Sequence, residues 1–197
     1  GTNMTASSVA TGGSTTCAVL NDGTLKCWGS NNYGQLGDGT TTSSANPVTV
    51  DLGTSVTATN VSVGGGHTCA RLNDGTLKCW GLNNRGQLGD NTNVNRTYPS
   101  PVDLGTDMTA VATSVGSDRS CAVLNDGTLK CWGFNSSGQL GDGTAIDRVS
   151  PVTVDLGTNM TASSVATGGS TTCAVLNDGT LKCWGASIGD GSTASSA

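Results

Sequence analysis

Eight cysteines have the clearest capacity for chemistry in this chain. They form pairs ten residues apart, and the pairs recur every 52 residues: Cys17 and Cys27, Cys69 and Cys79, Cys121 and Cys131, Cys173 and Cys183. Such thiols can form disulfides, bind zinc or remain free. Zinc motifs usually place cysteines two to four residues apart, and eight free thiols at periodic positions would be a coincidence. We therefore predict four disulfides, one within each pair.

The segment between two paired cysteines is typical of a hairpin. In CAVLNDGTLKCWG (17–29), a three-residue loop Asn21-Asp22-Gly23 with a left-handed glycine gives a type I turn followed by a bulge. This loop sets Cys17 opposite Cys27, with Cβ atoms about 4.5–5.5 Å apart, which a twisted strand pair can reduce to disulfide distance. A two-residue Asp-Gly loop would set Cys17 against Trp28 instead. The cysteine spacing therefore selects the turn type.

These disulfides would supply stability and indicate a compartment. The chain has one Phe and two Tyr to fill a core, so bridges worth about 2–3 kcal/mol each in the entropy model would matter. Disulfides persist in oxidising environments. We expect an extracellular or cell-surface location.

No catalytic residues, metal site or cofactor are predicted, and we expect a protein that is not an enzyme. His67 is the single histidine, its repeat equivalents are Thr15, Arg119 and Thr171, and no GxSxG motif accompanies it. It is interpreted as a strand residue rather than a base. Aspartates in GDGT-like loops lack the DxDxDG pattern of calcium loops and are interpreted as turn residues: Asp38, Asp90, Asp142 and Asp190.

The overall composition favours short strands and turns. The chain has 197 residues, 30 glycines, 14 acidic residues that are all Asp, and 12% charged residues. Helix is disfavoured, because Glu is absent and Asp is a poor helix former. A net charge of −5 with scattered Lys and Arg argues against nucleic-acid binding. No apolar run of about 18 residues is present, so no membrane insertion is expected.

Everything around the cysteines obeys the same period of 52 residues. Each unit shows four short extended stretches, which in one unit are 48–52, 56–64, 68–72 and 76–80. Periods of 40–50 residues with four strands indicate propeller blades. We predict an all-β, propeller-like array of about four blades in one domain, and leave open whether it forms a small ring or an open stack. The predicted repeats are 1–52, 53–104, 105–156 and a truncated 157–197.

The repeated motif resembles that of a known family. The pattern CA-x-LNDGTLKCWG-x-N-x-x-GQLGDGT, with Trp28-Gly29 and Gly34 to Gly37 recurring in register, is similar to the regulator of chromosome condensation repeat in its bacterial, cysteine-bearing version. The resemblance implies a β-propeller, usually seven-bladed. The fourth repeat departs from the pattern, since GASIGDGST lacks the Gln-Leu pair. The namesake activity, nucleotide exchange on a small nuclear GTPase, is not carried over from the fold.

The two ends of the sequence lead to an assembly hypothesis. Residues 1–29 are identical to 157–185. We expect the last blade to be one strand short and the first strand region to lack its partner, either because the chain is a window from a longer array or because its ends complete one blade. Exposed edges invite pairing with another copy, and head-to-tail contacts make filaments. The expected partner is a second copy or another extracellular protein.

The alternative function is a sugar- or protein-binding propeller that uses loops which differ between repeats. The candidate binding residues are Tyr33, Arg85, Arg96, Tyr98 and Arg148. Five Asn-x-Ser/Thr sequons are candidate glycosylation sites in a glycosylating host: Asn3, Asn60, Asn95, Asn135 and Asn159.

Overall fold

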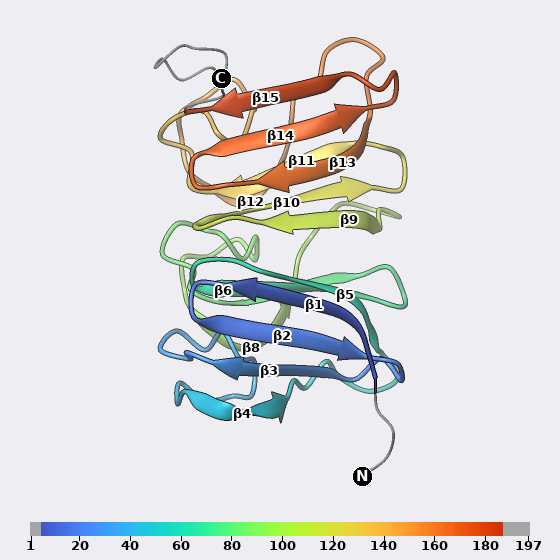
Figure 1. The fold of residues 1–197 in the computed structure, drawn as a ribbon. Helices are drawn as coiled ribbons and strands as arrows, with labels where there is room; N and C mark the ends of the chain where they lie inside the picture. The colour runs from blue at the N-terminus through green and yellow to red at the C-terminus, as the bar shows by residue number, and fades with distance from the viewer. Residues whose placement is uncertain (1–4, 187–197) are drawn as a thin grey trace.

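The computed structural model describes residues 5–186, and that part of the chain is built from fifteen β-strands joined by turns and loops (Figure 1). The strands are β1 (Ala6–Gly12), β2 (Thr15–Leu20), β3 (Leu25–Gly29), β4 (Ser44–Thr49), β5 (Ala58–Val63), β6 (His67–Leu72), β7 (Leu77–Gly81), β8 (Arg96–Pro101), β9 (Ala110–Val115), β10 (Arg119–Leu124), β11 (Leu129–Gly133), β12 (Arg148–Thr153), β13 (Ala162–Thr167), β14 (Thr171–Leu176) and β15 (Leu181–Gly185).

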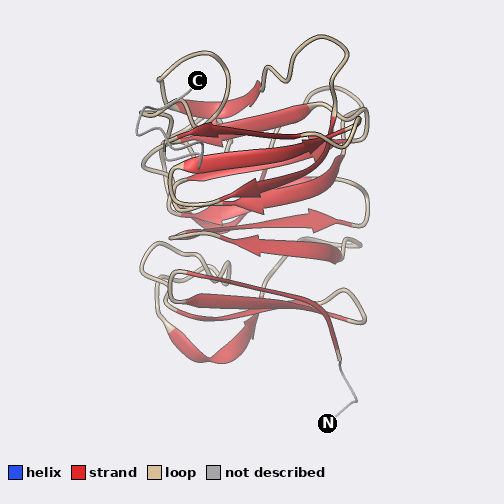
Figure 2. Ribbon diagram, turned by 45° about the horizontal axis from the view of Figure 1, so that its top comes forward, coloured by secondary structure: helices blue, strands red, loops and turns tan. Residues whose placement is uncertain are grey.

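The strands form four antiparallel sheets, one after another along the chain. Sheet 1 holds β1 to β4, sheet 2 holds β5 to β8, sheet 3 holds β9 to β12, and sheet 4 holds β13 to β15. The sheets stack in chain order without closing into a ring (Figures 1 and 2). The first strand of each sheet contacts the first two strands of the sheet before it. Each sheet lies within one predicted repeat, and the repeat limits themselves stay a prediction.

The hairpin that carries the cysteines has the predicted register. Cys17 pairs with Cys27 and Val19 with Leu25, and Gly23 adopts a φ of 79°. The Gly23 amide donates to the Leu20 carbonyl (2.9 Å), as a three-residue loop requires. The same pairing recurs in every sheet, and all four predicted disulfides are present with Cα atoms 4.1 Å apart.

Two expectations about the strands are wrong. The outer strand of sheet 1 is Ser44–Thr49 rather than 48–52; Val50 and Leu52 follow it and are buried, because their side chains fill the space beside the next sheet. The first strand region does have a partner, since β1 pairs with β2 and sheet 1 has four strands. Sheet 4 has three strands in the described range.

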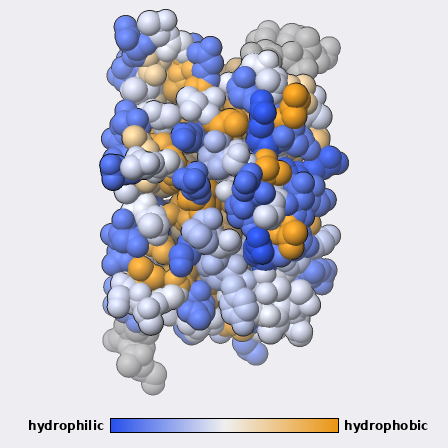
Figure 3. Space-filling model, turned by 180° about the vertical axis from the view of Figure 1, so that it is seen from behind, coloured by the Kyte–Doolittle hydropathy of each residue, from blue (hydrophilic) through white to orange (hydrophobic). Residues whose placement is uncertain are grey.

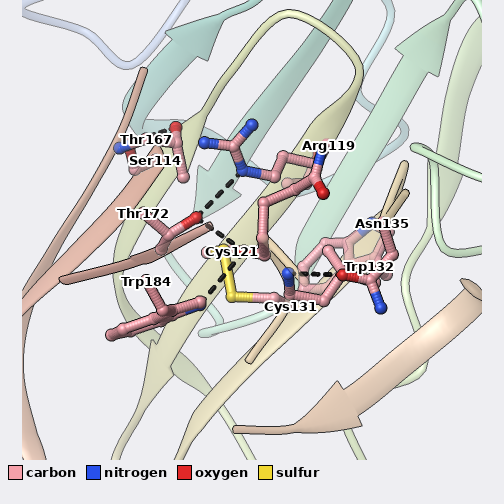
Figure 4. Close-up of a disulfide and its surroundings, with 12 residues drawn as sticks. Ser114, Arg119, Cys121, Cys131, Trp132, Asn135, Thr167, Thr172 and Trp184 are labelled. Carbon is pink, nitrogen blue, oxygen red and sulfur yellow. Dashed lines mark hydrogen bonds between the residues drawn. A yellow bond between two sulfur atoms is a disulfide. The ribbon is translucent and has the colours of Figure 1, made fainter. Parts of the chain in front are cut away.

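The core lies between successive sheets. Each of the first three disulfides is buried in a cluster with the tryptophan of the following sheet: Cys17–Cys27 with Trp80, Cys69–Cys79 with Trp132, and Cys121–Cys131 with Trp184. Figure 4 shows Trp184 beside the Cys121–Cys131 bridge. Because single sheets cannot bury both faces, this stacking supplies the core that each one lacks.

Several hydrogen bonds join each sheet to the one before it, and two of them come from the periodic tryptophans and lysines. The Trp132 indole N–H donates to the Gln87 carbonyl (3.0 Å), and the Lys130 ammonium donates to the Leu104 carbonyl (3.0 Å). The equivalent bonds have the same geometry at the other two junctions. The periodic tryptophans and lysines of sheets 2 to 4 are therefore structural, and they fix the relative position of neighbouring sheets.

Candidate functional site

The strands run across the stack, and the side of the stack at which the third strands end carries three long loops, 30–43, 82–95 and 134–147, which join the third and fourth strands of their sheets (Figure 1). We call this side the long-loop face. The opposite side of the stack carries the Asn-Asp-Gly hairpin turns and is called the hairpin-turn face (Figure 1).

A buried asparagine organises each long loop. Asn135 is 0% exposed; its amide N–H groups donate to Asp142, Thr144 and the Ile146 carbonyl, and its side-chain oxygen accepts from the Leu140 amide (2.8 Å). Asn31 and Asn83 make the same contacts in their loops. A loop of fourteen residues is thereby held in one conformation, which is a requirement for a preformed binding surface.

The loop aspartates have a turn role. In the second loop the Asp90 carboxylate accepts from the Thr92 amide (3.1 Å) and hydroxyl (2.7 Å). Partial burial acts to raise the pKa of Asp90, but the bonds from Thr92 and Arg96 outweigh it and hold the pKa below its usual value. Asp38 and Asp142 make equivalent turns, and Asp190 lies outside the described residues. Among residues 5–186, no group of three His, Cys, Asp or Glu residues is placed to hold a metal ion.

Two of the predicted binding arginines are held by these aspartates. Arg96 donates to Asp90 (2.7 Å) and Arg148 to Asp142 (2.7 Å). Their guanidinium groups brace the long loops, and each side chain remains one third or more exposed. The equivalent residue after the first loop is Ser44, the first residue of β4, so Asp38 has no arginine at the position of Arg96 and Arg148.

Arg85 and Tyr33 occupy equivalent positions on the long-loop face and reach across to the next sheet. The Arg85 guanidinium lies 5.1 Å from the centroid of the Phe134 ring and 3.4 Å from the Asp147 carboxylate. It remains 51% exposed. Tyr33 lies near Gly66 and Leu82 of sheet 2 and is 43% exposed. Because one flank of each side chain is supported by the next sheet, both are presented to solvent in a defined orientation.

Exposed apolar residues extend the same face. Val94 and Ile146 occupy equivalent positions in the second and third loops and are 58% and 61% exposed. Tyr98 belongs instead to β8 on the outer rim and is 56% exposed. The five predicted binding residues are thus divided: Tyr33 and Arg85 share the long-loop face, Arg96 and Arg148 brace loops, and Tyr98 lies on the rim.

The sequons differ in accessibility. Asn95 and Asn159 are exposed and Asn60 is half-buried, so these three remain candidates. The candidate at Asn135 is wrong for the folded protein, because this side chain is buried and its amide hydrogens are already bonded. Asn3 lies outside the described residues.

His67 is a buried strand residue, as predicted. It is 0% exposed, and its Nε2 lies 2.9 Å from the Ser120 hydroxyl of the next sheet. The same Ser120 hydroxyl lies within hydrogen-bond distance of the Gln87 carbonyl (2.9 Å). Arg119, at the equivalent position one sheet later, bonds Thr172 and the Gly169 carbonyl of sheet 4 (Figure 4). Neither side chain is available to a substrate.

Burial of His67 makes the stability of the fold depend on pH. Desolvation lowers the pKa of His67 from 6.5 to about 3. The unfolded chain therefore takes up a proton first as the pH falls, and stability that is complete above pH 6.5 is lost progressively down to about pH 3. Between pH 7 and pH 5 the expected loss is about 2 kcal/mol.

The His67→Gln variant tests this dependence, because glutamine keeps a donor for Ser120 and does not titrate. Urea unfolding at pH 7 and pH 5 should show the loss in the wild type and a much smaller one in the variant. His67 is the single histidine, and the aspartates with shifted pKa values titrate below 3.8. Equal losses in the two proteins would contradict the assignment.

The sequence did not identify three features of this face as functional: the Phe134 ring, the Asp147 carboxylate and the buried asparagines of the long loops. Asn31, Asn83 and Asn135 recur with the 52-residue period, and that periodicity was a usable signal. Phe134 and Asp147 are not periodic, so their contact with Arg85 could not be found without the structure.

The antiparallel sheets stack on one another, and the indole N–H of each following sheet donates to the Gly-Gln-Leu-Gly loop of the sheet before it. This arrangement, with its rigid long loops on one face, defines a propeller-type repeat protein. The regulator of chromosome condensation (RCC1) repeat matches residues 22–71, 74–123 and 126–175, and a second description of the same repeat matches 6–35, 58–87 and 110–139. The chain belongs to the RCC1 repeat family.

Curated relatives include a receptor and a probable ligase. The chain is 33% identical over 179 residues to the ultraviolet-B receptor UVR8 of Arabidopsis thaliana, covering 90% of this chain and 40% of the receptor. It is 34% identical over 135 residues to the probable E3 ubiquitin-protein ligase HERC3 of Homo sapiens, covering 68% of this chain and 13% of the ligase. The chain therefore spans less than half the length of these relatives.

Solved structures share the fold. Prp20p of Saccharomyces cerevisiae superposes with a TM-score of 0.87 at 21% identity, over 100% of this chain and 50% of that one. Human WBSCR16 gives a TM-score of 0.84 at 25% identity, over 99% and 53%. Prp20p has binding properties toward Gsp1p and histones. No helix in residues 5–186 has the length and apolar character that crossing a membrane would require.

Proposed function

We propose that this chain is a protein-interaction module that works in an oxidising compartment, secreted or at the cell surface, and binds a partner protein through its long-loop face. The observation that carries the proposal is the Arg85–Phe134 stack beside Asp147, with Tyr33 in the equivalent position one sheet earlier. Arginine and tyrosine are the residue types that dominate binding energy at protein interfaces.

Rigidity supports the same proposal. The loops that carry Tyr33 and Arg85 are fixed by the buried Asn31 and Asn83, so little conformational entropy is lost when a partner binds. Relatives of the family bind proteins, as the complex of Prp20 with Kap60 and the binding of Prp20p to Gsp1p and histones illustrate. The disulfides support an oxidising location. The contacts of His67 support a role other than catalysis, since its Nε2 is bonded inside the core.

The experiment compares partner capture by the wild type and by the Tyr33→Ser/Arg85→Ser variant, using surface and secreted proteins of the source organism. Serine is the residue that the chain itself has at the third equivalent position, Ser137, so the variant should fold. Loss of a hot-spot pair should weaken capture at least tenfold.

The matched control is Asp107→Asn on the hairpin-turn face. Asn159 is the natural equivalent of Asp107, and both adopt a positive φ, 59° and 60°. The control should capture the same protein as the wild type. If the double serine variant captures the partner as well as the wild type does, binding occurs elsewhere and the proposal is refuted.

A second candidate is head-to-tail self-assembly into an extracellular filament. It is favoured by apolar side chains on the outer faces of the stack: Val9 and Leu181 are each 65% exposed, whereas the equivalent Val61 and Leu25 are 4% and 1% exposed. In addition, β15 pairs with β14 alone among the described strands. A growing mass on sedimentation at rising concentration, abolished by Leu181→Lys, would support it; a constant monomer mass would refute it.

A further inference from the structure

The aspartates of the second and third long loops each hold an arginine of their own sheet. In the second loop the Asp90 Oδ2 atom accepts from the Arg96 guanidinium (2.7 Å), and the Thr92 hydroxyl accepts from the same guanidinium (3.5 Å). In the third loop Arg148 donates to Asp142 Oδ2 (2.7 Å) and to the threonine two residues after that aspartate (3.3 Å). The chain thus contains two examples of a guanidinium that is bound by one carboxylate oxygen and one threonine hydroxyl.

The first loop has the same turn without the guanidinium. Asp38 Oδ1 accepts from the Thr40 amide (3.0 Å) and hydroxyl (2.8 Å), and from the Asn31 side-chain amide (3.2 Å). Among the residues that the structure describes, none donates to the other carboxylate oxygen, Oδ2. The residue at the arginine position is Ser44, and its hydroxyl donates to the Asn46 carbonyl (2.8 Å) instead.

The place that the guanidinium occupies in the other two loops is open to solvent in the first. Thr92 and Thr144, which contact the arginines, are half-buried, whereas Thr40 is exposed. No other part of the described chain has therefore replaced the arginine, because such a group would bury Thr40 as the arginines bury its equivalents. The Asp38 Oδ2 atom and the Thr40 hydroxyl are available to a group from outside.

An aromatic ring borders this place. Tyr98 of β8 reaches across from sheet 2 and lies directly against Gly39, the residue between the aspartate and the threonine, and it is 56% exposed. The equivalent residue beside the second loop is Ser150. Strand β8 lies on the far side in Figure 1, the side seen in Figure 3, where hydrophilic residues are interspersed with apolar ones. Guanidinium groups stack on aromatic faces, so the ring favours the same kind of ligand as the carboxylate does.

We propose that Asp38 and Thr40, with Tyr98 beside them, bind the guanidinium group of an arginine that a partner protein presents. The proposal rests on the interaction-module function above, because a partner must supply the arginine. A guanidinium is planar and has five N–H donors, so it can reach the carboxylate and the hydroxyl together, whereas a lysine ammonium is a compact point charge. The net charge of −5 also favours the approach of a basic partner.

The test uses N-acetyl-arginine amide as a probe at constant ionic strength. It needs no partner, so it can fail independently of the proposed function. We expect saturable amide shift changes in the spectrum of the oxidised, ¹⁵N-labelled chain at Gly39, Thr40 and Ser44. N-acetyl-lysine amide should bind more weakly, because it has no planar pair of donors.

Two variants exchange the arginine between the loops. Ser44→Arg copies the second and third loops into the first and should weaken probe binding at least tenfold. This variant should fold, because β8 and β12 both begin with an arginine at the equivalent position. The reverse change, Arg96→Ser, should expose the second aspartate and add a second set of saturable shifts at Asn91 and Thr92. The first loop shows that the turn forms with a serine at this position.

The Tyr33→Ser/Arg85→Ser variant should leave probe binding unchanged, which separates this site from the surface proposed above. Three results would overturn the proposal. The first is the absence of saturable shifts up to the solubility limit of the probe. The second is a Ser44→Arg variant that binds the probe as the wild type does. The third is a lysine probe that binds as tightly as the arginine probe, which would mean that the loop attracts any cation.

Discussion

Replacing Trp132 by alanine should lower the free energy of unfolding by about 3–5 kcal/mol. The indole is 0% exposed and belongs, with the Cys69–Cys79 bridge and Leu124, to the core that joins sheets 2 and 3. Its removal leaves a cavity at a junction that cannot collapse, because the backbones of the two sheets are fixed by hydrogen bonds on either side. It also leaves the Gln87 carbonyl without the indole donor.

Trp28 provides a matched control within the same chain. It lies in an identical LKCWG strand but is only half-buried, and the described part of the chain places no preceding sheet against it. The Trp28→Ala variant should therefore lose about 1–2 kcal/mol. Both variants can be measured by urea unfolding of the oxidised protein. Similar losses at the two positions would show that the indole stabilises its own hairpin rather than the junction between sheets.

The hairpins were predictable because the covalent constraint and the local turn chemistry agree. Cys17 and Cys27 can meet across only one of the two available turns, and Gly23 supplies the left-handed residue which that turn needs. The hairpin register and its disulfide follow from these few letters. The repeat period then extends one correct hairpin to four, and the family resemblance supplies the propeller-type stacking.

The outer strand was misplaced for a physical reason. Alternating apolar residues report which side chains are buried, and Val50 and Leu52 are indeed buried. However, they are buried between sheets after the strand has ended, where the Val50 amide still donates to the Leu25 carbonyl (3.0 Å). Alternating burial along the sequence therefore does not by itself show the residue at which a hydrogen-bonded β-strand ends.

The candidate site was predictable only in part. Differences between repeats identified Tyr33 and Arg85 as surface residues, but the same criterion selected Arg96 and Arg148, which bond Asp90 and Asp142. A sequon is a three-residue signal and contains no information on burial; only the recurrence of Asn135 at Asn31 and Asn83, which Asn95 lacks, distinguishes the buried asparagine from the exposed one. Partners that lie far away in the sequence, such as Phe134 and Asp147 for Arg85, are brought together by sheet stacking.

The disulfides occupy the same junctions as the tryptophans, and this location determines the second large effect. The Cys121→Ala/Cys131→Ala variant should lose about 3–5 kcal/mol: about 2–3 kcal/mol from the loop constraint on the unfolded chain, and the remainder from two sulfur atoms removed beneath Trp184. The sulfurs belong to a core in which Cys121 and Cys131 are 1% and 0% exposed. Urea unfolding of the oxidised variant against the oxidised wild type measures the loss.

Cys173–Cys183 is the matched comparison, because it has the same loop length and both of its cysteines are only half-buried. The Cys173→Ala/Cys183→Ala variant should lose only the loop contribution, about 2–3 kcal/mol. Under native conditions a mild reductant should also open this bridge first, because thiolate attack needs access to sulfur, and intact mass should rise by two hydrogens before any further step. If the three buried bridges open as fast as this one, or if both variants lose the same stability, the bridges act on the unfolded chain alone and contribute nothing to the packing of one sheet on the next.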